Sequence, residues 1–349
     1  MNDSMTWSQI LGKLLARENL TRSEAAWAMG EMMSGKATDA QIAGFLLALR
    51  SKGEIPEEIS GFVDVMLQNS VKVPVSDTAV DIVGTGGDQL GTLNISSMAA
   101  IVAAATGYPV LKHGSRSASG KTGSSEFLEA LGINLSVSPE RLAQIFDQLG
   151  IGFFFAPLFH PALKNVAQVR KELGVPTTFN VLGPLANPVQ PIATALGVAN
   201  KTTLPLIVGD LVNRGRTALV FRGEDGLDEL TTTGPSQLYI ISAQNVQEVT
   251  FEPESLGIKR TSLKSLIGGN PEQNAQIAMN VFSATEGESP VTDIVCLNAA
   301  AAMTAFDLAL NQDFSFKASM TENYQRVHQA LLEGKVKQKL DSWVEESHR

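Results

Sequence analysis

A glycine-rich loop between an apolar strand and an apolar helix is the part of the sequence whose residue types most clearly indicate chemistry. The segment reads Asp81-Ile-Val-Gly-Thr-Gly-Gly-Asp88, and Asn94-Ile-Ser-Ser97 then opens a helix. Glycine lacks a Cβ, so such a loop can adopt positive φ and direct several backbone N–H groups at one anion. Helix N-termini also favour negative charge. Gly-Gly turns are often only tight turns, but this combination predicts a phosphate-binding loop.

A basic stretch follows the loop in a chain that is acidic as a whole. The formal net charge is −9, yet no Asp or Glu occurs between Gln89 and Ser125, where Lys112, Arg116 and Lys121 lie. Lys112 directly follows a short apolar run that predicts a second parallel strand. It would therefore lie beside the glycine loop, at the edge where open α/β sheets bind ligands. Isolated Lys and Arg are usually solvated, but two strand ends with anion-binding groups favour a binding site.

Two adjacent carboxylates follow a later predicted strand. Asp228 and Glu229 stand in the loop after an apolar run at 218–221, and we expect both to be exposed. Mg²⁺ commonly binds one or two carboxylates together with substrate phosphates and water. An arbitrary Asp-Glu pair is more often a solvated turn, but beside a phosphate-binding loop it predicts a magnesium site.

Length and composition limit the possible classes of protein. A chain of 349 residues, 44% hydrophobic and 18% charged, is typical of one large globular domain with a smaller one. We expect no membrane span and no signal peptide, because the apolar runs are short and the N-terminus lacks the required regions. The single cysteine, Cys296, excludes an intrachain disulfide. The acidic balance argues against nucleic acid, and we expect a cytoplasmic protein.

The predicted elements divide the chain into two parts. Residues 1 to about 70 predict four amphipathic helices, with capping boxes at Thr21 and Thr38 and apolar stripes such as Ile10 to Leu15. Strands then alternate with helices, which predicts a mainly parallel sheet covered by helices. The predicted strands are 80–83, 110–111, 151–155, 193–198 and 218–221, with a hairpin at 239–241 and 246–251. The predicted helices between them are 96–105, 125–131, 139–149 and 204–212.

Over nearly its whole length the sequence resembles the anthranilate phosphoribosyltransferase family. The motifs that carry the resemblance occur in the family's order, at 84–88, 94–97, 112–114, 160–161, 169–174, 179–185 and 227–229. The resemblance implies that the phosphoribosyl group of phosphoribosyl pyrophosphate (PRPP) is transferred to the amine of anthranilate, with release of pyrophosphate, in tryptophan biosynthesis. It implies a homodimer with a nucleoside phosphorylase/phosphoribosyltransferase-like fold. Residues 1–72, joined by helices from about 160–187, would form a small helical domain, and residues 73–349 a large α/β domain.

The resemblance also implies the site residues, none of them a covalent nucleophile. PRPP would be held by Gly84, Thr85, Gly86, Gly87, Asp88, Thr92, Asn94, Ser96, Ser97, Lys112 and Ser124. Anthranilate would be held by Gly84, His113, Ser115, Arg170 and Gly183, with Arg170 facing its carboxylate and Pro157 and His160 at the entry. Mg²⁺ would be held by Ser96, Asp228 and Glu229.

Two departures from the family pattern keep alternatives open. Ser115 stands where the family usually has Asn, and Gly120 where it usually has Ser. A paralogue with a different aromatic acceptor is one alternative, and a pyrimidine nucleoside phosphorylase-like enzyme, which uses phosphate, is another. A non-catalytic nucleic-acid-binding paralogue would be expected to lose the glycine loop and gain a basic face. A Rossmann dehydrogenase is excluded because no G-x-G-x-x-G follows the first strand.

Overall fold

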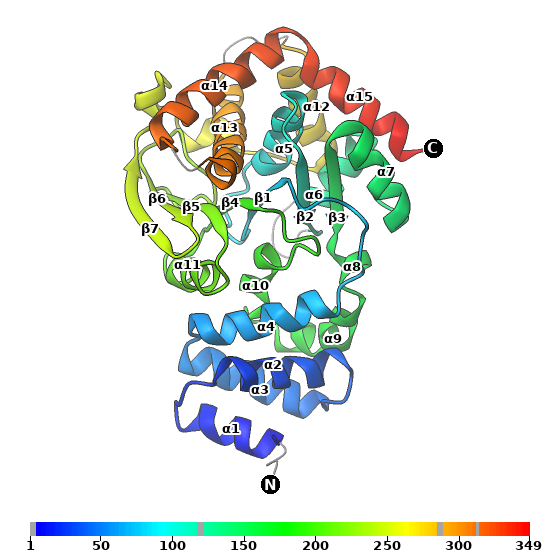
Figure 1. Cartoon of the computed structure of the whole chain (residues 1–349), viewed down its shortest axis with the longest axis vertical. Coiled ribbons are helices and arrows are strands. Elements are labelled where there is room, and N and C mark those ends of the chain that lie inside the picture. The colour runs from blue at the N-terminus through cyan, green and yellow to red at the C-terminus, as the bar shows by residue number, and fades with distance from the viewer. Residues whose placement is uncertain (1–4, 117–121, 285–288, 312–313) are drawn as a thin grey trace.

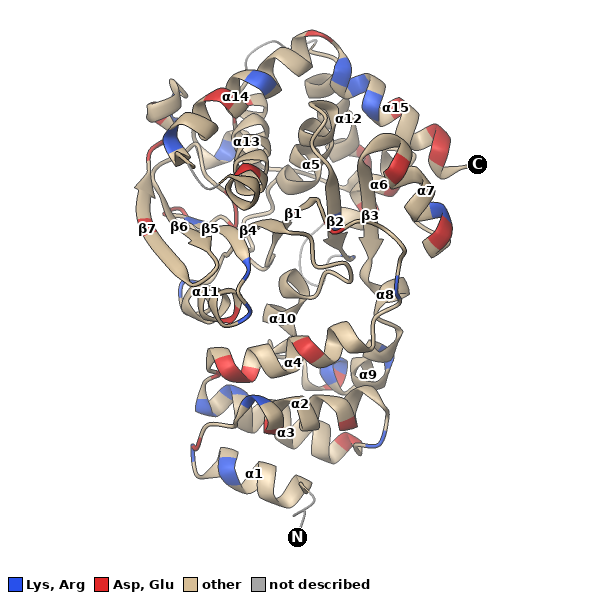
Figure 2. Cartoon of the chain, viewed as in Figure 1, with Lys and Arg blue, Asp and Glu red and all other residues tan. Residues whose placement is uncertain are grey.

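The computed structural model describes residues 5–116, 122–284, 289–311 and 314–349. Figure 1 shows a bundle of helices at the N-terminal end and a larger part in which helices flank a sheet. Gly120 and Lys121 lie outside the described residues. Figure 2 shows acidic and basic residues interspersed along the helices of both parts.

The N-terminal bundle forms as its sequence pattern predicts. Its helices are α1 (Trp7–Leu15), α2 (Arg22–Met33), α3 (Asp39–Lys52) and α4 (Pro56–Gln68). Both capping boxes form, with the Thr21 and Thr38 hydroxyls accepting from the backbone N–H three residues later. Ile10 and Leu14 are buried, but Leu15 is 78% exposed, so the apolar stripe of α1 is narrower than predicted.

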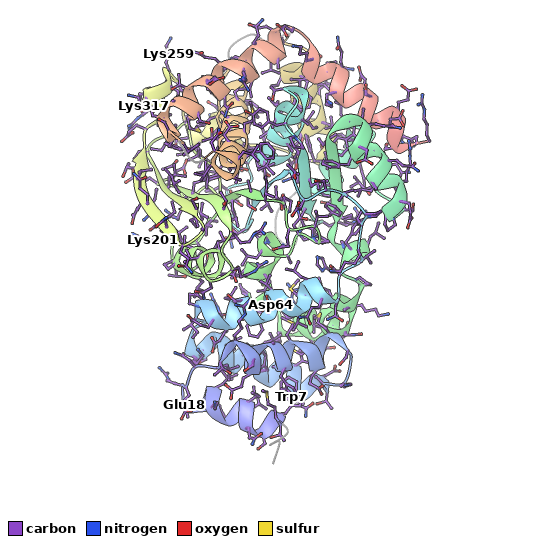
Figure 3. All side chains as sticks on the ribbon, in the orientation of Figure 1. Trp7, Glu18, Asp64, Lys201, Lys259 and Lys317 are labelled. Atoms are coloured by element: carbon purple, nitrogen blue, oxygen red, sulfur yellow. The ribbon has the colours of Figure 1, made fainter. Side chains whose placement is uncertain are left out.

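A later segment of the chain returns to this bundle. Helix α9 (Lys164–Leu173) packs against α2 and α3, and Asn165 Nδ2 donates to the Met33 carbonyl at 2.7 Å. Trp7, labelled in Figure 3, packs on Trp27 with ring centroids 5.4 Å apart. The bundle is therefore closed by residues more than 100 positions apart in the sequence.

The larger part is built on a seven-stranded sheet of order β3-β2-β1-β4-β5-β6-β7. The strands are β1 (Val80–Gly84), β2 (Val110–Gly114), β3 (Ile151–Phe155), β4 (Ala193–Gly197), β5 (Thr217–Gly223), β6 (Ser236–Ser242) and β7 (Asn245–Phe251). Strands β1 to β5 run parallel to one another. Strand β6 runs antiparallel to both of its neighbours, β5 and β7. The predicted parallel sheet and hairpin are confirmed.

The chain order reverses between β1 and β4. From β1 the chain proceeds outward through β2 to β3 and then returns to the other side of β1 with β4. In open α/β sheets, ligands bind in the crevice at the carboxyl ends of the strands at such a topological switch point.

Successive strand residues face two different cores, because side chains alternate across a sheet. Ile82 contributes to the core under α5 (Ile95–Ala105) and α13 (Pro290–Leu310), and Val83 to the core shared with α11 (Leu204–Asn213) and the bundle. The remaining helices cover the sheet and its connections. They are α6 (Ser124–Ala130), α7 (Pro139–Leu149), α8 (Ala156–Phe159), α10 (Phe179–Leu182), α12 (Pro271–Phe282), α14 (Phe316–Leu332) and α15 (Lys335–Ser347).

Helix α13 is long and apolar enough to cross a membrane by length and composition alone. The sequence prediction that no apolar stretch is long enough rests on uninterrupted apolar runs. The apolar segment of α13 also contains polar residues such as Asp293 and Asn298. However, 78% of the apolar 18-residue segment of α13 is buried inside the structure, and the helix packs against α5, α14 and β4. Its apolar character is accounted for by its place in the core.

Candidate active site

Two glycines at the ends of β1 and β4 allow another loop to close over the switch point. Gly84 and Gly197 are partners in the parallel ladder. A Cβ at Gly84 would clash with Asp228 Oδ2, and a Cβ at Gly197 would clash with the Asp228 carbonyl oxygen. The loop that carries Asp228 therefore lies directly on the carboxyl ends of these strands, where a ligand site is expected.

The glycine loop binds a carboxyl group of this chain. Gly86 and Gly87 have φ of +64° and +78°, a region that side chains with a Cβ rarely adopt. The Gly86 N–H donates to Asp228 Oδ2 at 2.7 Å. Thr85 fixes the base of the loop, since its N–H donates to the Gly197 carbonyl at 3.0 Å. A backbone amide of the loop thus already makes the type of contact that an anion would require.

Lys112 lies inside β2, two residues before its end, because the strand is longer than the predicted 110–111. It is 3% exposed, and its Nζ donates to the Ile82 carbonyl and, at 3.2 Å, to Ser96 Oγ. The Ser96 N–H, at the start of α5, donates to Glu229 Oε1 at 3.0 Å. The structure therefore brings together the predicted cation, helix N-terminus and acidic pair.

The acidic pair is less accessible than the sequence suggested. Glu229 is 7% exposed and Asp228 is half-buried, so the expectation that both carboxyl groups are exposed is wrong. Burial, followed by the proximity of Asp88, raises the pKa of Asp228 to about 6. Burial, followed by the proximity of Asp228, raises the pKa of Glu229 well above its usual value. Burial lowers the pKa of Lys112, although the nearby carboxyl groups oppose the shift, and this one cation faces two carboxyl groups.

These donors fit a hard divalent cation that arrives together with phosphate groups. Within the described ranges, no group of three or more His, Cys, Asp or Glu side chains is arranged to hold a metal ion. Asp228, Glu229 and Ser96 offer oxygen atoms only, and the two carboxyl groups lack a full counter-charge. Mg²⁺ typically takes one or two carboxylates and completes its shell with water and substrate phosphates.

His113 faces the opposite side of β2 from Lys112 and is a neutral imidazole. Its Nδ1 lies 3.0 Å from the Gly183 carbonyl oxygen; because a carbonyl only accepts, Nδ1 carries the proton and Nε2 keeps its lone pair. Burial, followed by the neighbouring His160, lowers the pKa of His113 to about 3. Among the described residues, the buried His113 Nε2 has no hydrogen-bond partner.

The segment that carries Gly183 is fixed to the sheet by a buried polar network. Asn187 Nδ2 donates to Asp81 Oδ2 at 2.9 Å and to the Leu111 carbonyl at 2.8 Å. Asp81 Oδ1 accepts the His113 N–H at 3.2 Å. The network thus links β1, β2 and the chain that returns from the bundle, and it sets the distance between His113 and Gly183.

His160 lies deeper than an entry position. It is 3% exposed, its Nε2 lies 2.7 Å from the Ala186 carbonyl, and its ring packs edge-on against His113 with centroids 5.3 Å apart. The His160 ring therefore helps to hold the His113 ring in place. Pro157, in contrast, is exposed.

Arg170 is a half-buried cation in the last turn of α9. Its guanidinium carbon lies 4.9 Å from the centroid of the Phe179 ring. Its side chain has no ion pair or hydrogen bond within the part of the chain that the structure describes, and burial lowers its pKa. A half-buried guanidinium stacked on an aromatic ring is pre-oriented for a carboxylate ligand.

The end of β2 approaches the start of α6 closely. A Cβ at Gly114 would clash with Ser124 Oγ, and Ser124 Oγ donates to the Ser115 carbonyl at 3.2 Å. Ser115 itself is exposed, as is Arg116, which pairs with Glu129 at 3.2 Å. Arg116 therefore has a structural partner on α6.

The remaining predicted residues lie along the glycine loop and the helix after it. Asp88 Oδ1 accepts the Leu90 N–H at 3.2 Å, and Thr92 forms an isolated bridge with Ile267. Ser97 is 1% exposed, and its hydroxyl oxygen has no partner among the described residues.

Sequence reasoning missed three buried asparagines that hold this site. Asn187 was missed although it closes the network under His113. Asn298, on α13, accepts the Leu230 N–H at 3.0 Å and donates to the Leu230 carbonyl at 2.9 Å, which fixes the loop beside Glu229. Asn274 contacts Asn94 at 2.9 Å. The Gly268-Gly269 pair before α12 was the one available signal, because it resembles the first glycine loop.

Comparison with protein families assigns both parts of the chain. Residues 76–337 match the model described as "Glycosyl transferase family, a/b domain", and residues 8–70 match "Glycosyl transferase family, helical bundle domain". The chain belongs to this glycosyl transferase family, as the switch-point site and the two-part fold indicate.

Individual relatives place it more narrowly, among the anthranilate phosphoribosyltransferases. An anthranilate phosphoribosyltransferase of Leifsonia xyli is 49% identical over 349 residues, covering 99% of both chains. The enzyme of Acidothermus cellulolyticus is also 49% identical, over 99% of this chain and 96% of its own. The crystal structure of the Thermus thermophilus enzyme has a TM-score of 0.88 at 38% identity, over 97% of this chain and 99% of that one. The Saccharomyces cerevisiae enzyme in complex with PRPP and Mg has a TM-score of 0.88 at 25% identity, over 99% of both chains.

Proposed function

We propose that this chain transfers the phosphoribosyl group of PRPP to the amine of anthranilate and releases pyrophosphate, as a step of tryptophan biosynthesis. The observation that supports this most directly is the contact of Asp228 and Glu229 with the Gly86 and Ser96 amides, beside Lys112, at the switch point. The Gly86 amide, the Ser96 amide and Lys112 can each bind an anion, and they lie with a carboxylate pair at one edge of the sheet. Such a surface suits a pyrophosphate group that binds together with a cation. The relatives' names support the acceptor.

The glycine loop and α5 would bind the pyrophosphate end of PRPP. The Gly86 and Gly87 amides and the start of α5 offer donors, and Lys112 supplies positive charge. Asp228, Glu229 and Ser96 would hold Mg²⁺, which when bound adds positive charge next to the phosphate groups. Charge develops on pyrophosphate as its bond to the anomeric carbon breaks, and pre-oriented donors stabilise such charge without reorganising.

The acceptor would lie between His113, Gly183 and Arg170. Arg170 would pair with the carboxylate of anthranilate. The His113 Nε2 lone pair is available to accept a hydrogen bond from the aromatic amine. The Gly183 carbonyl accepts from Nδ1 of the same imidazole and so holds that ring in place. Burial keeps the pKa of His113 at about 3, so its imidazole is a weak base. His113 would therefore orient the neutral amine and would not act as a strong base toward it. The rate then depends on positioning and electrostatics.

The organisation of the chain is proposed on the same basis. Residues 1–72, with helices from about 160–187, form a helical domain, and residues 73–349 an α/β domain; packing of α9 on α2 and α3 supports this division. The family resemblance supports a homodimer and a cytoplasmic location, without nucleic acid or membrane as partners. Sedimentation velocity tests the dimer.

The decisive experiment follows anthranilate fluorescence with PRPP, with and without Mg²⁺. We expect PRPP-dependent loss of fluorescence and release of pyrophosphate; consumption of phosphate would support a nucleoside phosphorylase instead. The double variant Asp228→Asn, Glu229→Gln should lose activity by roughly 10²-fold or more. Its folding should survive, because both substitutions are isosteric and remove buried acidic groups.

The matched control is Glu224→Gln, an exposed residue of the same loop, which should turn over like the wild type. Wild-type turnover by the double variant at limiting Mg²⁺ would contradict the metal assignment.

A further inference from the structure

Four hydrogen bonds form a closed ring beside the proposed PRPP site. The Gly269 N–H donates to Asn274 Oδ1 at 2.7 Å, and Asn274 Nδ2 donates to Asn94 Oδ1 at 2.9 Å. Asn94 Nδ2 donates to the Thr122 carbonyl at 3.1 Å, and Thr122 Oγ1 donates to the Gly269 carbonyl at 2.9 Å. The ring joins the start of α5, the start of α6 and the start of α12, which lie far apart in the sequence.

Backbone groups fix the orientation of both amides in the ring. A backbone N–H can only donate, so Asn274 presents its oxygen to Gly269 and its nitrogen to Asn94. A backbone carbonyl can only accept, so Asn94 presents its nitrogen to Thr122. The Asn94 amide therefore has one N–H left over and its oxygen engaged, which makes it a donor toward an anion.

The same segment pairs with the returning arm of the glycine loop. The Leu93 N–H donates to the Leu266 carbonyl at 3.0 Å, and the Gly268 N–H donates to the Gly91 carbonyl at 2.8 Å. A Cβ at Gly268 would lie 2.8 Å from Asn274 Oδ1, closer than real Cβ contacts. The absence of a side chain there allows the segment to approach the amide, and the approach fixes the arm.

Burial makes the ring sensitive to the loss of one member. Asn274 is 1% exposed, so its removal would leave the Gly269 N–H and the Asn94 oxygen without their partner. An unsatisfied buried group is costly, and the Asn94 amide would then be held only by its hydrogen bond to the Thr122 carbonyl.

We propose that Asn274 and Thr122 are positioning residues for PRPP binding: they hold the Asn94 amide with its donor toward the pyrophosphate and fix the glycine loop to the start of α6. The inference rests on the proposed function, since it assigns PRPP to this loop.

The test compares Asn274→Ala, Thr122→Val and Thr122→Ser with the wild type. Asn274→Ala should raise the KM for PRPP about five- to twenty-fold, as the loss of one to two buried hydrogen bonds predicts. The KM for anthranilate at saturating PRPP should stay within two-fold. Thr122→Val should weaken PRPP several-fold, and Thr122→Ser, which keeps the hydroxyl, should restore it. The double variant Asn274→Ala, Thr122→Val should be little worse than Asn274→Ala alone, because the ring is already open.

A buried asparagine far from the site separates positioning from stability. Asn323 is 1% exposed and donates to Asp307 Oδ2 at 2.8 Å. Asn323→Ala should lower Tm while leaving the KM for PRPP unchanged. Gln276→Ala, an exposed amide on the same helix as Asn274, should change neither quantity.

Calorimetric titration with PRPP and Mg²⁺ measures binding independently of turnover. A wild type that binds PRPP, together with Asn274→Ala and Thr122→Val variants of unchanged affinity, would overturn the positioning role alone. A wild type that binds no PRPP would overturn both this inference and the proposed function. If Asn274→Ala does not fold, the Thr122→Val and Thr122→Ser pair decides: equal affinity of the two overturns the inference, and weaker binding by Thr122→Val supports it.

Discussion

Arg170 is a half-buried cation that stacks on Phe179 and has no carboxylate partner within the described chain. A guanidinium opposite a ligand carboxylate typically contributes about 1.5–3 kcal/mol through charge-assisted hydrogen bonds. Arg170→Ala should therefore raise the KM for anthranilate roughly ten-fold or more and leave the KM for PRPP nearly unchanged. Lys171→Ala, an exposed cation on the same turn, is the control. Equal effects of Arg170→Ala on both substrates would indicate a structural role instead.

The buried carboxyl group of Asp81 leads to a second prediction for a single residue, which concerns how stability depends on pH. Burial raises the pKa of Asp81 from about 3.8 to about 6, although Lys112, Asn187 and the His113 amide oppose the shift. Between these pH values the folded state keeps a proton on Asp81 that the unfolded state has released. The contribution of Asp81 to stability is therefore fully present below about pH 4 and is lost as the pH rises through about 6. The loss attributable to Asp81 is about 3 kcal/mol.

Urea unfolding of the wild type and of Asp81→Asn between pH 4 and pH 7 measures this effect. The wild-type free energy of unfolding should fall relative to that of the variant over this range. The charge of Lys112 acts on Asp81, and Arg214 and Arg216 line the same small cavity as Asp81. Both proteins contain these three groups. Parallel profiles would show that Asp81 does not titrate in this window.

At the scale of elements, the ends of β1 and β4 decide whether the acidic loop can reach the switch point. Gly197→Ala would push its Cβ into the Asp228 backbone, so the loop must move. We expect kcat to fall about ten- to hundred-fold, the Mg²⁺ requirement to rise, and stability to drop by ~1–3 kcal/mol, the usual cost of overpacking.

Gly152→Ala is the matched control within the same sheet. Its Cβ would lie 3.1 Å from Leu111 Cδ2, so it also overpacks a strand, but it leaves Asp228 in place. Its kcat should remain near the wild-type value. A similar loss of kcat in both variants, with a similar loss of stability, would mean that strand packing and not the acidic loop determines the rate.

At the scale of the whole molecule, ligand binding should be visible as stability. The carboxyl pair and the anion-binding amides occupy one site, so each ligand reduces the repulsion that the other would meet. PRPP with Mg²⁺ at 100 times its Kd should stabilise the fold by about 2.7 kcal/mol, and Tm should rise by several degrees. PRPP alone or Mg²⁺ alone should each give a much smaller shift in thermal unfolding. An equal shift with Mg²⁺ alone would contradict a site completed by substrate phosphates.

Local features of this protein were predictable from the sequence because they depend on neighbouring residues. The capping boxes at Thr21 and Thr38 need partners only three residues away, and the bounds of β3 and α7 follow from short apolar runs with flanking stop signals. The apolar stripes of residues 1 to about 70 predicted the helical start, and the alternation of strands and helices after it predicted the parallel sheet. The motif resemblance indicated the family that the comparisons confirm, while the roles of its site residues stay predictions.

Tertiary structure decided the features that join distant positions. Leu15 is exposed and Glu229 buried, contrary to expectation, because burial depends on what packs above a residue and not on its own periodicity. Lys112 and His113 serve opposite faces of β2 because the strand extends through them. Asn274 meets Asn94 across 180 positions. No local pattern specifies such a pair, since only the folded chain brings the starts of α5 and α12 together and places the two amides within hydrogen-bond distance.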